Sequence, residues 1–162
     1  MALDEIRKTK IKKIEELRKS GVDPYPASSG RTNKISEVID NFEKWVLPQV
    51  PGLHQKEFTL AGRVMSIREH GGSIFFDLRD ESGKIQGYIK EDIVGAEIFK
   101  RFVDFVNIGD FLDITGPLFT SVRKKEKSID VREFRLLAKT LLPLPEKWHG
   151  LEDVEERLRK RY

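Results

Sequence analysis

The sequence predicts a mainly β domain with a helical extension on its N-terminal side. Three observations support this fold class. Apolar residues recur at helical spacing over residues 1–20 and again over residues 33–48. From residue 56 onward the period changes to two, which is typical of half-buried strands, and the helical spacing interrupts this pattern over residues 91–106. The 162 residues are enough for one good core with a smaller attachment.

The predicted extension contains two helices of different character. Residues 1–20 are mostly Lys, Arg and Glu, so a narrow apolar stripe predicts a helix that packs lightly or projects, and Gly21 ends it. The stripe consists of Ile11, Ile14 and Leu17. After a linker rich in glycine, proline and serine, the second helix has Asn33 as its expected N-cap and is closed by Pro48 and Pro51. Its wider apolar face consists of Ile35, Val38, Ile39, Phe42, Trp45 and Val46.

Five strands with one helix among them are predicted after the extension, and a charged helix is predicted to begin at residue 151. The strands cover residues 57–69, 73–80, 83–90, 110–122 and 128–139. Gly62 lies inside the first strand, which indicates a bend or a bulge there. The helix between the third and fourth strands has Asp92 as a plausible cap. Its buried residues are expected to be Ile98, Phe99, Phe102 and Val103.

This order of elements is that of the OB-fold. Three strands, a helix and two strands form a five-stranded Greek-key barrel with the helix between strands three and four. The strand count, the position of the helix and the glycine in the first strand agree independently, although another small β-rich domain is an alternative. The predicted division is a helical extension over 1–55, the OB-fold over 56–142, and a linker with the start of a further domain over 143–162.

Composition excludes several function classes. With 38% hydrophobic and 35% charged residues the chain is neither disordered nor membrane-spanning, because apolar runs recur but stay short. It has no cysteine, and its three histidines are far apart, so we expect no disulfide and no metal site. We find neither a glycine-rich phosphate loop nor a nucleophile with its base, so we expect no catalytic residue and no cofactor in this chain. A cytoplasmic location is the expectation. The net charge of +3 leans mildly toward polyanionic partners.

Phe75 is the residue that points most clearly to binding. In the second predicted strand Ile74, Phe76 and Leu78 face inward, which leaves the Phe75 ring on the outer face. In an OB-fold the face of strands two and three binds oligonucleotides, where an aromatic ring can stack on a base for about 1–3 kcal/mol. Gln86 on the next strand can read a base edge because its amide both donates and accepts. The whole predicted face comprises Phe75, Arg79, Lys84, Gln86, Tyr88 and Lys90.

Two loops flank this face. The loop between strands one and two carries Arg68 and His70, and a basic hairpin joins strands four and five at residues 123–127. Either loop could contact a nucleic-acid backbone. Alternatives stay open for each feature: Phe75 could contact the N-terminal helices or be a stray surface ring, and the hairpin could be a solvated tip whose charge discourages edge pairing. The lysines could serve solubility alone.

Several motifs resemble the anticodon-binding N-terminal domain of class II lysyl-tRNA synthetases. They are LAGRVMSIRE, FFDLRDESGKIQGYI, a GPLF strand, and VREFRLLAKTLLPLPEKWHGLEDVEERLRKRY. The likeness covers nearly the whole chain and is strongest over residues 58–162. Aspartyl- and asparaginyl-tRNA synthetases share the OB-fold and the Phe…Gln pair but lack the last of these motifs, which separates them from this chain.

The resemblance implies roles for particular residues. Phe75 would stack the central anticodon uridine and Gln86 would read its edge, with Glu133 in the same pocket and with Arg63 and Arg68 positioning anticodon nucleotides or phosphates. Candidates for the phosphate backbone are Lys84, Arg123, Lys124 and Lys125, together with Lys8, Lys12 and Lys13 of the first helix. One departure is the hairpin tip RKKEK, which lacks the glycine common in the family and leaves the turn type open.

The resemblance also implies a larger parent protein. Family members continue into a catalytic domain that uses ATP and magnesium to join lysine to tRNA, and the intact enzyme is a homodimer. This chain would therefore bind the tRNA(Lys) anticodon stem-loop without aminoacylating it, with its own oligomeric state left open. Two alternatives remain. One is a freestanding OB-fold protein that binds single-stranded nucleic acid or a protein partner. The other is a scaffold that dimerises through its N-terminal helices.

Overall fold

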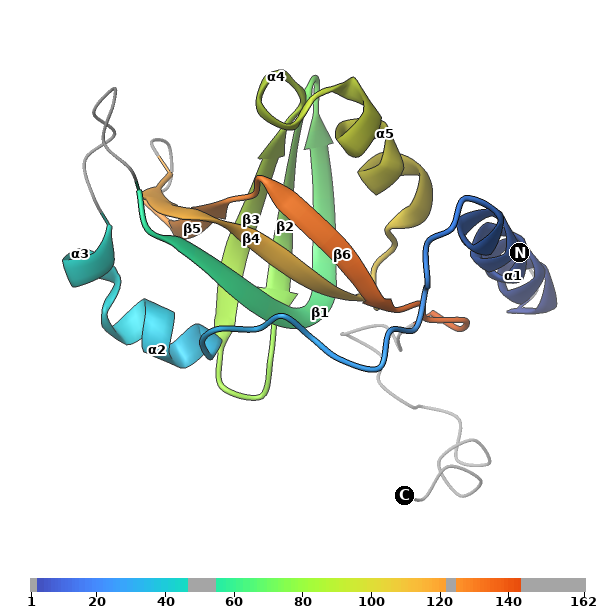
Figure 1. Cartoon of the computed structure of the whole chain (residues 1–162), viewed down its shortest axis with the longest axis horizontal. Coiled ribbons are helices and arrows are strands. Elements are labelled where there is room, and N and C mark those ends of the chain that lie inside the picture. Colours follow the sequence, from blue (N-terminus) through green and yellow to red (C-terminus); the bar gives the residue numbers. More distant parts are fainter. Residues whose placement is uncertain (1–2, 47–54, 122–124, 144–162) are drawn as a thin grey trace.

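The computed structural model describes residues 3–46, 55–121 and 125–143 and contains helices followed by one sheet (Figure 1). The N-terminal helices are α1 (Leu3–Lys19), α2 (Ile35–Asp40) and α3 (Phe42–Trp45). The first three strands are β1 (Glu57–His70), β2 (Ser73–Arg79) and β3 (Lys84–Lys90). Then come α4 (Glu91–Val94), α5 (Ala96–Phe105), β4 (Phe111–Thr120), β5 (Lys127–Asp130) and β6 (Glu133–Ala138). The predicted order of three strands, a helical segment and further strands is confirmed.

The sheet closes into a ring through its first strand. The strand order is β1-β2-β3-β5-β4-β6, and β1 also pairs with β4. The strand β1 can serve both neighbours because it is long: its first half pairs with β4 and its second half with β2. Gly62 lies at this exchange, where a Cβ atom would stand 2.7 Å from the Arg79 carbonyl oxygen. The close approach of β1 and β2 therefore requires glycine at this position.

The core fills the interior of the ring. Alternate residues of the strands point inward and are fully or almost fully buried: Leu60, Val64, Ile74, Phe76, Leu78, Ile85, Ile89, Leu112, Ile114 and Ile129. The helix α5 covers one end, where the Phe102 ring lies 5.0 Å from that of Phe76. Gly87 makes room for Phe76, because a Cβ atom at this position would lie 2.3 Å from the Phe76 ring. The inward-facing residues predicted for β2 and β3 are thus confirmed.

Three predicted elements are each divided in two. The helix predicted over 91–106 breaks at Gly95, whose φ of +84° is a left-handed conformation that ends α4 and begins α5. The second N-terminal helix breaks at Asn41 into α2 and α3. The fifth predicted strand is interrupted after Asp130, so that β5 pairs with both β3 and β4 while β6 pairs with β4 alone. The second half of the predicted strand thereby reaches the open edge of the sheet.

Several predicted details of the helices were wrong. Lys34 rather than Asn33 is the N-cap of α2, because the Lys34 N–H donates to the Glu37 carboxylate one turn later. Asp92 lies inside the first turn of α4 and does not cap it. Val103 is 41% exposed, since only one side of the short helix α5 meets the core. Ile98 is half-buried. The prolines predicted to close the second helix and the predicted C-terminal helix lie outside the described residues.

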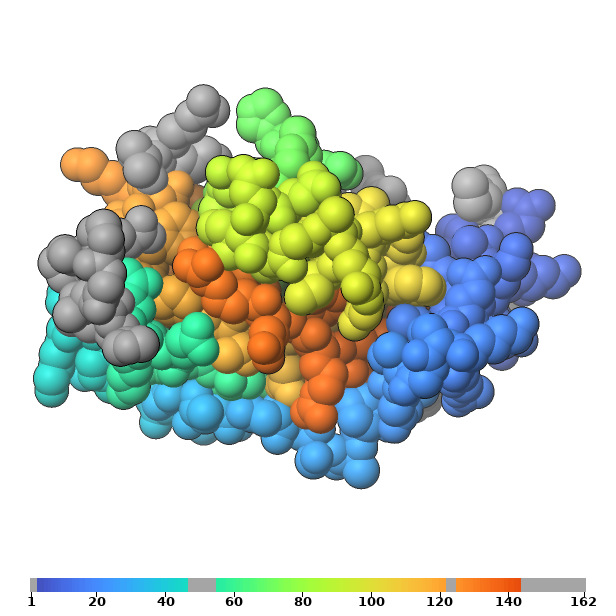
Figure 2. Space-filling model, turned by 45° about the horizontal axis from the view of Figure 1, so that its top comes forward, coloured from blue at the N-terminus to red at the C-terminus, as the bar shows by residue number. Residues whose placement is uncertain are grey.

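The helical extension contacts the sheet at separate places. Figures 1 and 2 both show α1 at the opposite end of the molecule from α3. The first helix buries Ile14 and Leu17, and Gly21 with φ +78° ends it, as predicted. None of the helices in the part of the chain that the structure describes is long and apolar enough to cross a membrane.

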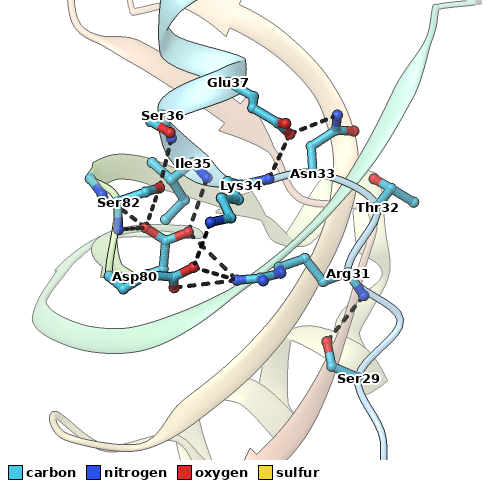
Figure 3. A network of polar contacts seen from close by, with 12 residues as sticks. Ser29, Arg31, Thr32, Asn33, Lys34, Ile35, Ser36, Glu37, Asp80 and Ser82 are labelled. Carbon is cyan, nitrogen blue, oxygen red and sulfur yellow. Dashed lines mark hydrogen bonds and ion pairs between the residues drawn. The ribbon is translucent and has the colours of Figure 1, made fainter.

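The β2–β3 loop caps the N-terminus of α2 (Figure 3). The Ile35 N–H donates to Oδ2 of Asp80 at 3.0 Å, and the Ser36 N–H donates to the Ser82 hydroxyl at 2.9 Å. The other Asp80 oxygen accepts from the Ser82 and Gly83 backbone at 2.7 and 2.8 Å. Burial by itself would raise the pKa of Asp80, but these hydrogen bonds outweigh it and lower the pKa. The loop is thereby ordered and joined to the helix.

Candidate nucleic-acid interface

The outer face of β2 and β3 is a continuous two-strand surface. Three cross-strand pairs form it: Phe75 with Tyr88, Asp77 with Gln86, and Arg79 with Lys84. The first pair lies near the α4 end of the strands and the last lies beside the β2–β3 loop. We use the name outer face for these six residues. The surface combines aromatic rings, an amide, cations and one carboxylate.

Phe75 lies on this face and not in the core. Its ring is half-buried, and its centroid is 4.8 Å from that of Tyr88. The Tyr88 ring is in turn 5.6 Å from that of Phe119 on β4. The predicted outward placement is confirmed, and the ring belongs to an aromatic row that crosses the sheet. Such a row gives unpaired bases flat apolar surfaces on which to stack.

A β-bulge in β1 brings two more polar residues to the same face. The pairing of β1 with β2 shifts at Met65: Val64 pairs with Leu78, and Ser66, not Met65, pairs with Asp77. One extra residue exchanges the two faces of the strand beyond it. Arg68 consequently lies directly opposite Phe75, and Ser66 lies beside Asp77. Strict alternation along β1 from Val64 would have turned Arg68 inward.

Gln86 faces outward but is only 7% exposed, which corrects its predicted exposure. Its Nε2 donates to the Glu126 carboxylate at 2.6 Å, and its Oε1 accepts from the Ser128 hydroxyl at 3.2 Å. These two bonds orient the amide. With the partners that the described residues supply, one N–H and one lone pair are left for a ligand. Glu126 and Ser128 were not among the predicted site residues, because contacts made across 40 positions of sequence leave no local signal.

The remaining residues of the predicted anticodon pocket are dispersed. Glu133 is exposed at the start of β6 opposite Thr115, and no hydrogen bond or ion pair among the described residues joins it to Gln86. The acidic neighbour of Gln86 is Glu126. Arg63 lies before the bulge, opposite Arg79, with its guanidinium 4.6 Å from the centre of the Phe111 ring. Arg68 lies beside Phe75, as described above.

The predicted phosphate contacts form a scattered set. Lys84 is exposed on the outer face, and Lys125 is exposed within the basic hairpin with a left-handed φ of +50°. Arg123 and Lys124 lie outside the described residues. In α1, Lys8 and Lys12 are exposed and Lys13 is half-buried. Their helix contacts a different part of the molecule from α2 and α3 (Figure 1).

One carboxylate close to the aromatic row is incompletely bonded. Asp130 on β5 lies opposite Tyr88 and is 5% exposed. Its Oδ2 pairs with Arg132 at 2.8 Å, whereas Oδ1 is buried without a hydrogen-bond partner among residues 3–46, 55–121 and 125–143. Burial raises the pKa of Asp130, and the Arg132 charge opposes the increase. Within the same residues no group of three or more His, Cys, Asp or Glu could hold a metal ion.

The closed sheet, the aromatic row and the oriented amide define an OB-fold domain built to bind nucleic acid. A family model described as an OB-fold nucleic acid binding domain, of the tRNA anticodon type, matches residues 58–137. Residues 58–137 belong to this family of OB-fold domains, and the relatives that the whole chain resembles are lysine–tRNA ligases. The resemblance found in the sequence is therefore confirmed.

The relatives are longer than this chain. It is 42% identical to the lysine–tRNA ligases of Carboxydothermus hydrogenoformans and Thermotoga maritima, over 99% of its own length and 31% of theirs. It is 46% identical to the lysine–tRNA ligase of Clostridium tetani, over 93% of its own length and 28% of the relative. The chain thus spans about a third of the length of the curated relatives that it matches.

Proposed function

We propose that this chain binds the anticodon stem-loop of a lysine-accepting tRNA and stacks the central anticodon uridine on Phe75. The observation that carries the proposal is the half-exposed Phe75 ring, with Arg68 opposite it on one side and the Tyr88 ring on the other. The family match and the names of the relatives supply the kind of RNA. Joining lysine to tRNA would require the remainder of the longer relatives.

Base recognition would combine stacking with a fixed amide. The Gln86 carbonyl points to Ser128 and its NH2 group to Glu126, so the group that Gln86 offers a base is set before the RNA arrives. Preorganised polar groups lower the cost of ordering on binding. Arg68 and Lys84, both exposed, would neutralise phosphates and make the affinity dependent on salt.

The test is a binding titration of wild type and Phe75→Ala with labelled anticodon-sized RNA hairpins at two salt concentrations. We expect the variant to bind the lysine-type hairpin more weakly by about 1–3 kcal/mol, because one stacked base is lost. Its salt dependence should be unchanged, because no charge is removed. Its melting temperature should change little, since the ring is outside the core.

Tyr25→Ala is the matched control. Tyr25 is an exposed ring of the linker, with its hydroxyl donating to the Lys139 carbonyl at 2.9 Å. This variant removes an aromatic side chain from another part of the molecule and should bind the hairpin as wild type does. Equal affinity of wild type and Phe75→Ala for the hairpin would refute the stacking role.

A further inference from the structure

Asp77 is an acidic residue in the middle of a surface proposed to bind a polyanion. Its side chain is 20% exposed, directly opposite Gln86 and two residues along β2 from Phe75. A carboxylate here repels phosphates, so general attraction of a polyanion does not account for it. Its contacts indicate what it could do.

The carboxylate is oriented and only partly used. The Ser66 hydroxyl donates to Oδ2 at 2.8 Å, and the β-bulge at Met65 is what brings Ser66 to this side. Oδ1 accepts no hydrogen bond from the residues that the structure describes. Its nearest cation is Arg68, with Nη2 4.0 Å away, which is an ion pair too long for a hydrogen bond. One acceptor oxygen is therefore held in place beside the Phe75 ring.

Cations lie beside both oxygens of the Asp77 carboxylate. Arg68 approaches Oδ1, and the Lys84 ammonium lies 3.7 Å from Oδ2. Both cationic side chains are about half exposed, so their remaining donors can reach a ligand. Going from β1 to β3, the surface thus presents a donor on Arg68, an acceptor on Asp77 and a donor on Lys84.

This order complements one nucleobase edge. The Watson–Crick edge of uracil presents O4, the N3–H group and O2, which are an acceptor, a donor and an acceptor. Cytosine has an unprotonated N3 at the central position and would direct a lone pair at the carboxylate. Purines also fail to match all three positions. Proteins read unpaired RNA bases on this edge while an aromatic ring stacks on the base.

We propose that Asp77 is a specificity residue that accepts the N3–H of the uridine stacked on Phe75, with Arg68 and Lys84 donating to the flanking carbonyls. The inference rests on the proposed function, because it needs a base on Phe75. Gln86, opposite Asp77, would add its one free N–H to the same edge. A base with an N–H group at the middle of its Watson–Crick edge donates to the Asp77 carboxylate. A base without that N–H covers the carboxylate and leaves it without a partner.

The experiment compares wild type with Asp77→Leu, a change that removes both charge and acceptor but keeps a side chain branched at Cγ. RNA hairpins carry uridine, cytidine or N3-methyluridine at the middle loop position, and affinity is measured by fluorescence anisotropy. Asp77→Leu should lose about tenfold in affinity for the uridine hairpin, because a hydrogen bond to a charged group is lost. Its affinity for cytidine should stay the same or rise. Wild type should discriminate uridine from N3-methyluridine, and the variant should not.

Two further variants separate charge from recognition. Asp77→Asn removes the charge but keeps a carbonyl acceptor, so it should retain part of the uridine preference. Asp92→Asn removes a carboxylate paired with Lys90 at 2.8 Å on α4, and it should change the affinity for all three hairpins by one factor. If Asp77→Leu also changes the affinity for all three hairpins by the same factor, Asp77 acts only as a charge and the inference is wrong.

The two proposals can fail separately. If Phe75→Ala binds every hairpin as wild type does, the proposed function fails. If Phe75→Ala weakens binding while Asp77→Leu keeps the wild-type ratio of uridine to cytidine affinity, stacking stands and only the role of Asp77 is overturned. Melting curves of each variant confirm that the folded protein is being compared.

Discussion

The β2–β3 loop and the sheet differ in how completely their buried carboxylates are hydrogen-bonded. In the loop, both oxygens of Asp80 accept hydrogen bonds, and Ile35 of the neighbouring helix is one of the donors (Figure 3). On the sheet, the Asp130 side chain is also almost fully buried, but it keeps one oxygen without a partner among the described residues. The pKa of Asp80 is lowered and that of Asp130 is raised.

The difference separates a region that serves folding from one that serves binding. A satisfied network holds the loop against α2 and so fixes the end of β2 and β3. The sheet surface keeps half-buried rings on β2 and β3 and, at Asp130 on β5, a carboxylate with one unpaired oxygen among the described residues. A buried polar group without a partner lowers stability. Natural sequences depart from full satisfaction mainly at functional sites. Each variant below tests one side of this comparison.

Asp80→Asn should have the largest effect on stability. The amide keeps one acceptor, but its NH2 group then faces a backbone N–H, so at least one buried donor loses its partner. We expect the free energy of unfolding to fall by about 2–3 kcal/mol near neutral pH. Denaturant titration followed by circular dichroism measures this. Affinity of the folded variant for RNA should stay unchanged, since the loop carries none of the proposed base contacts.

The pH dependence gives the sign of this contribution. Because the folded pKa of Asp80 lies below its ordinary value, its stabilisation is complete above the ordinary carboxyl pKa and is lost as pH falls through the folded one. The difference between wild type and variant should therefore shrink in acid. Glu81→Gln is the control, because this exposed neighbour pairs with Arg31 and Lys34 only at the surface. An equal loss of stability in both variants would contradict the capping role.

Asp130→Asn should act with the opposite sign. Removing a buried charge that lacks a full set of partners should leave the free energy of unfolding unchanged or raise it by about 1 kcal/mol at neutral pH. A carboxyl whose folded pKa is raised penalises the folded state above that pKa, and the penalty disappears as pH falls. The gain over wild type should thus vanish in acid. A clear loss of stability at neutral pH would show that Asp130 supports the fold.

The sequence predicted the parts of this site that depend on local periodicity. The alternation along β2 and β3 placed Phe75 outside and Ile74 and Phe76 inside, as observed. Periodicity could not reveal the bulge at Met65, because one inserted residue exchanges the faces without changing composition. For the same reason the positions of Arg68 and Ser66 relative to Asp77 were not predictable.

Contacts between distant segments were the other limit. Gln86 is covered by Glu126 and Ser128, which follow it by 40 residues or more, so its burial required the β3–β5 pairing to be known. The break of the helix at Gly95 could have been predicted from the sequence, since a glycine inside a helical pattern is a recognised break signal. Asp130 is buried because the predicted fifth strand divides and its first part, β5, pairs with β3. No local pattern in the sequence indicates this division.

Lys125→Gly should have the smallest effect. It tests whether the backbone conformation of Lys125 lowers the free energy of unfolding. Lys125 has φ +50°, a conformation that costs an L-residue with a side chain more than it costs glycine. We expect the free energy of unfolding to rise by at most about 1 kcal/mol.

The lost cation should reduce the slope of log affinity against log salt by about 0.7 if Lys125 contacts a phosphate. Lys125→Ala removes the same charge without the backbone freedom, so it should change the slope alike and give no gain in stability. Equal stability of the two variants would mean that the left-handed turn carries no strain, and the comparison between loop and surface would then rest on Asp80 and Asp130 alone.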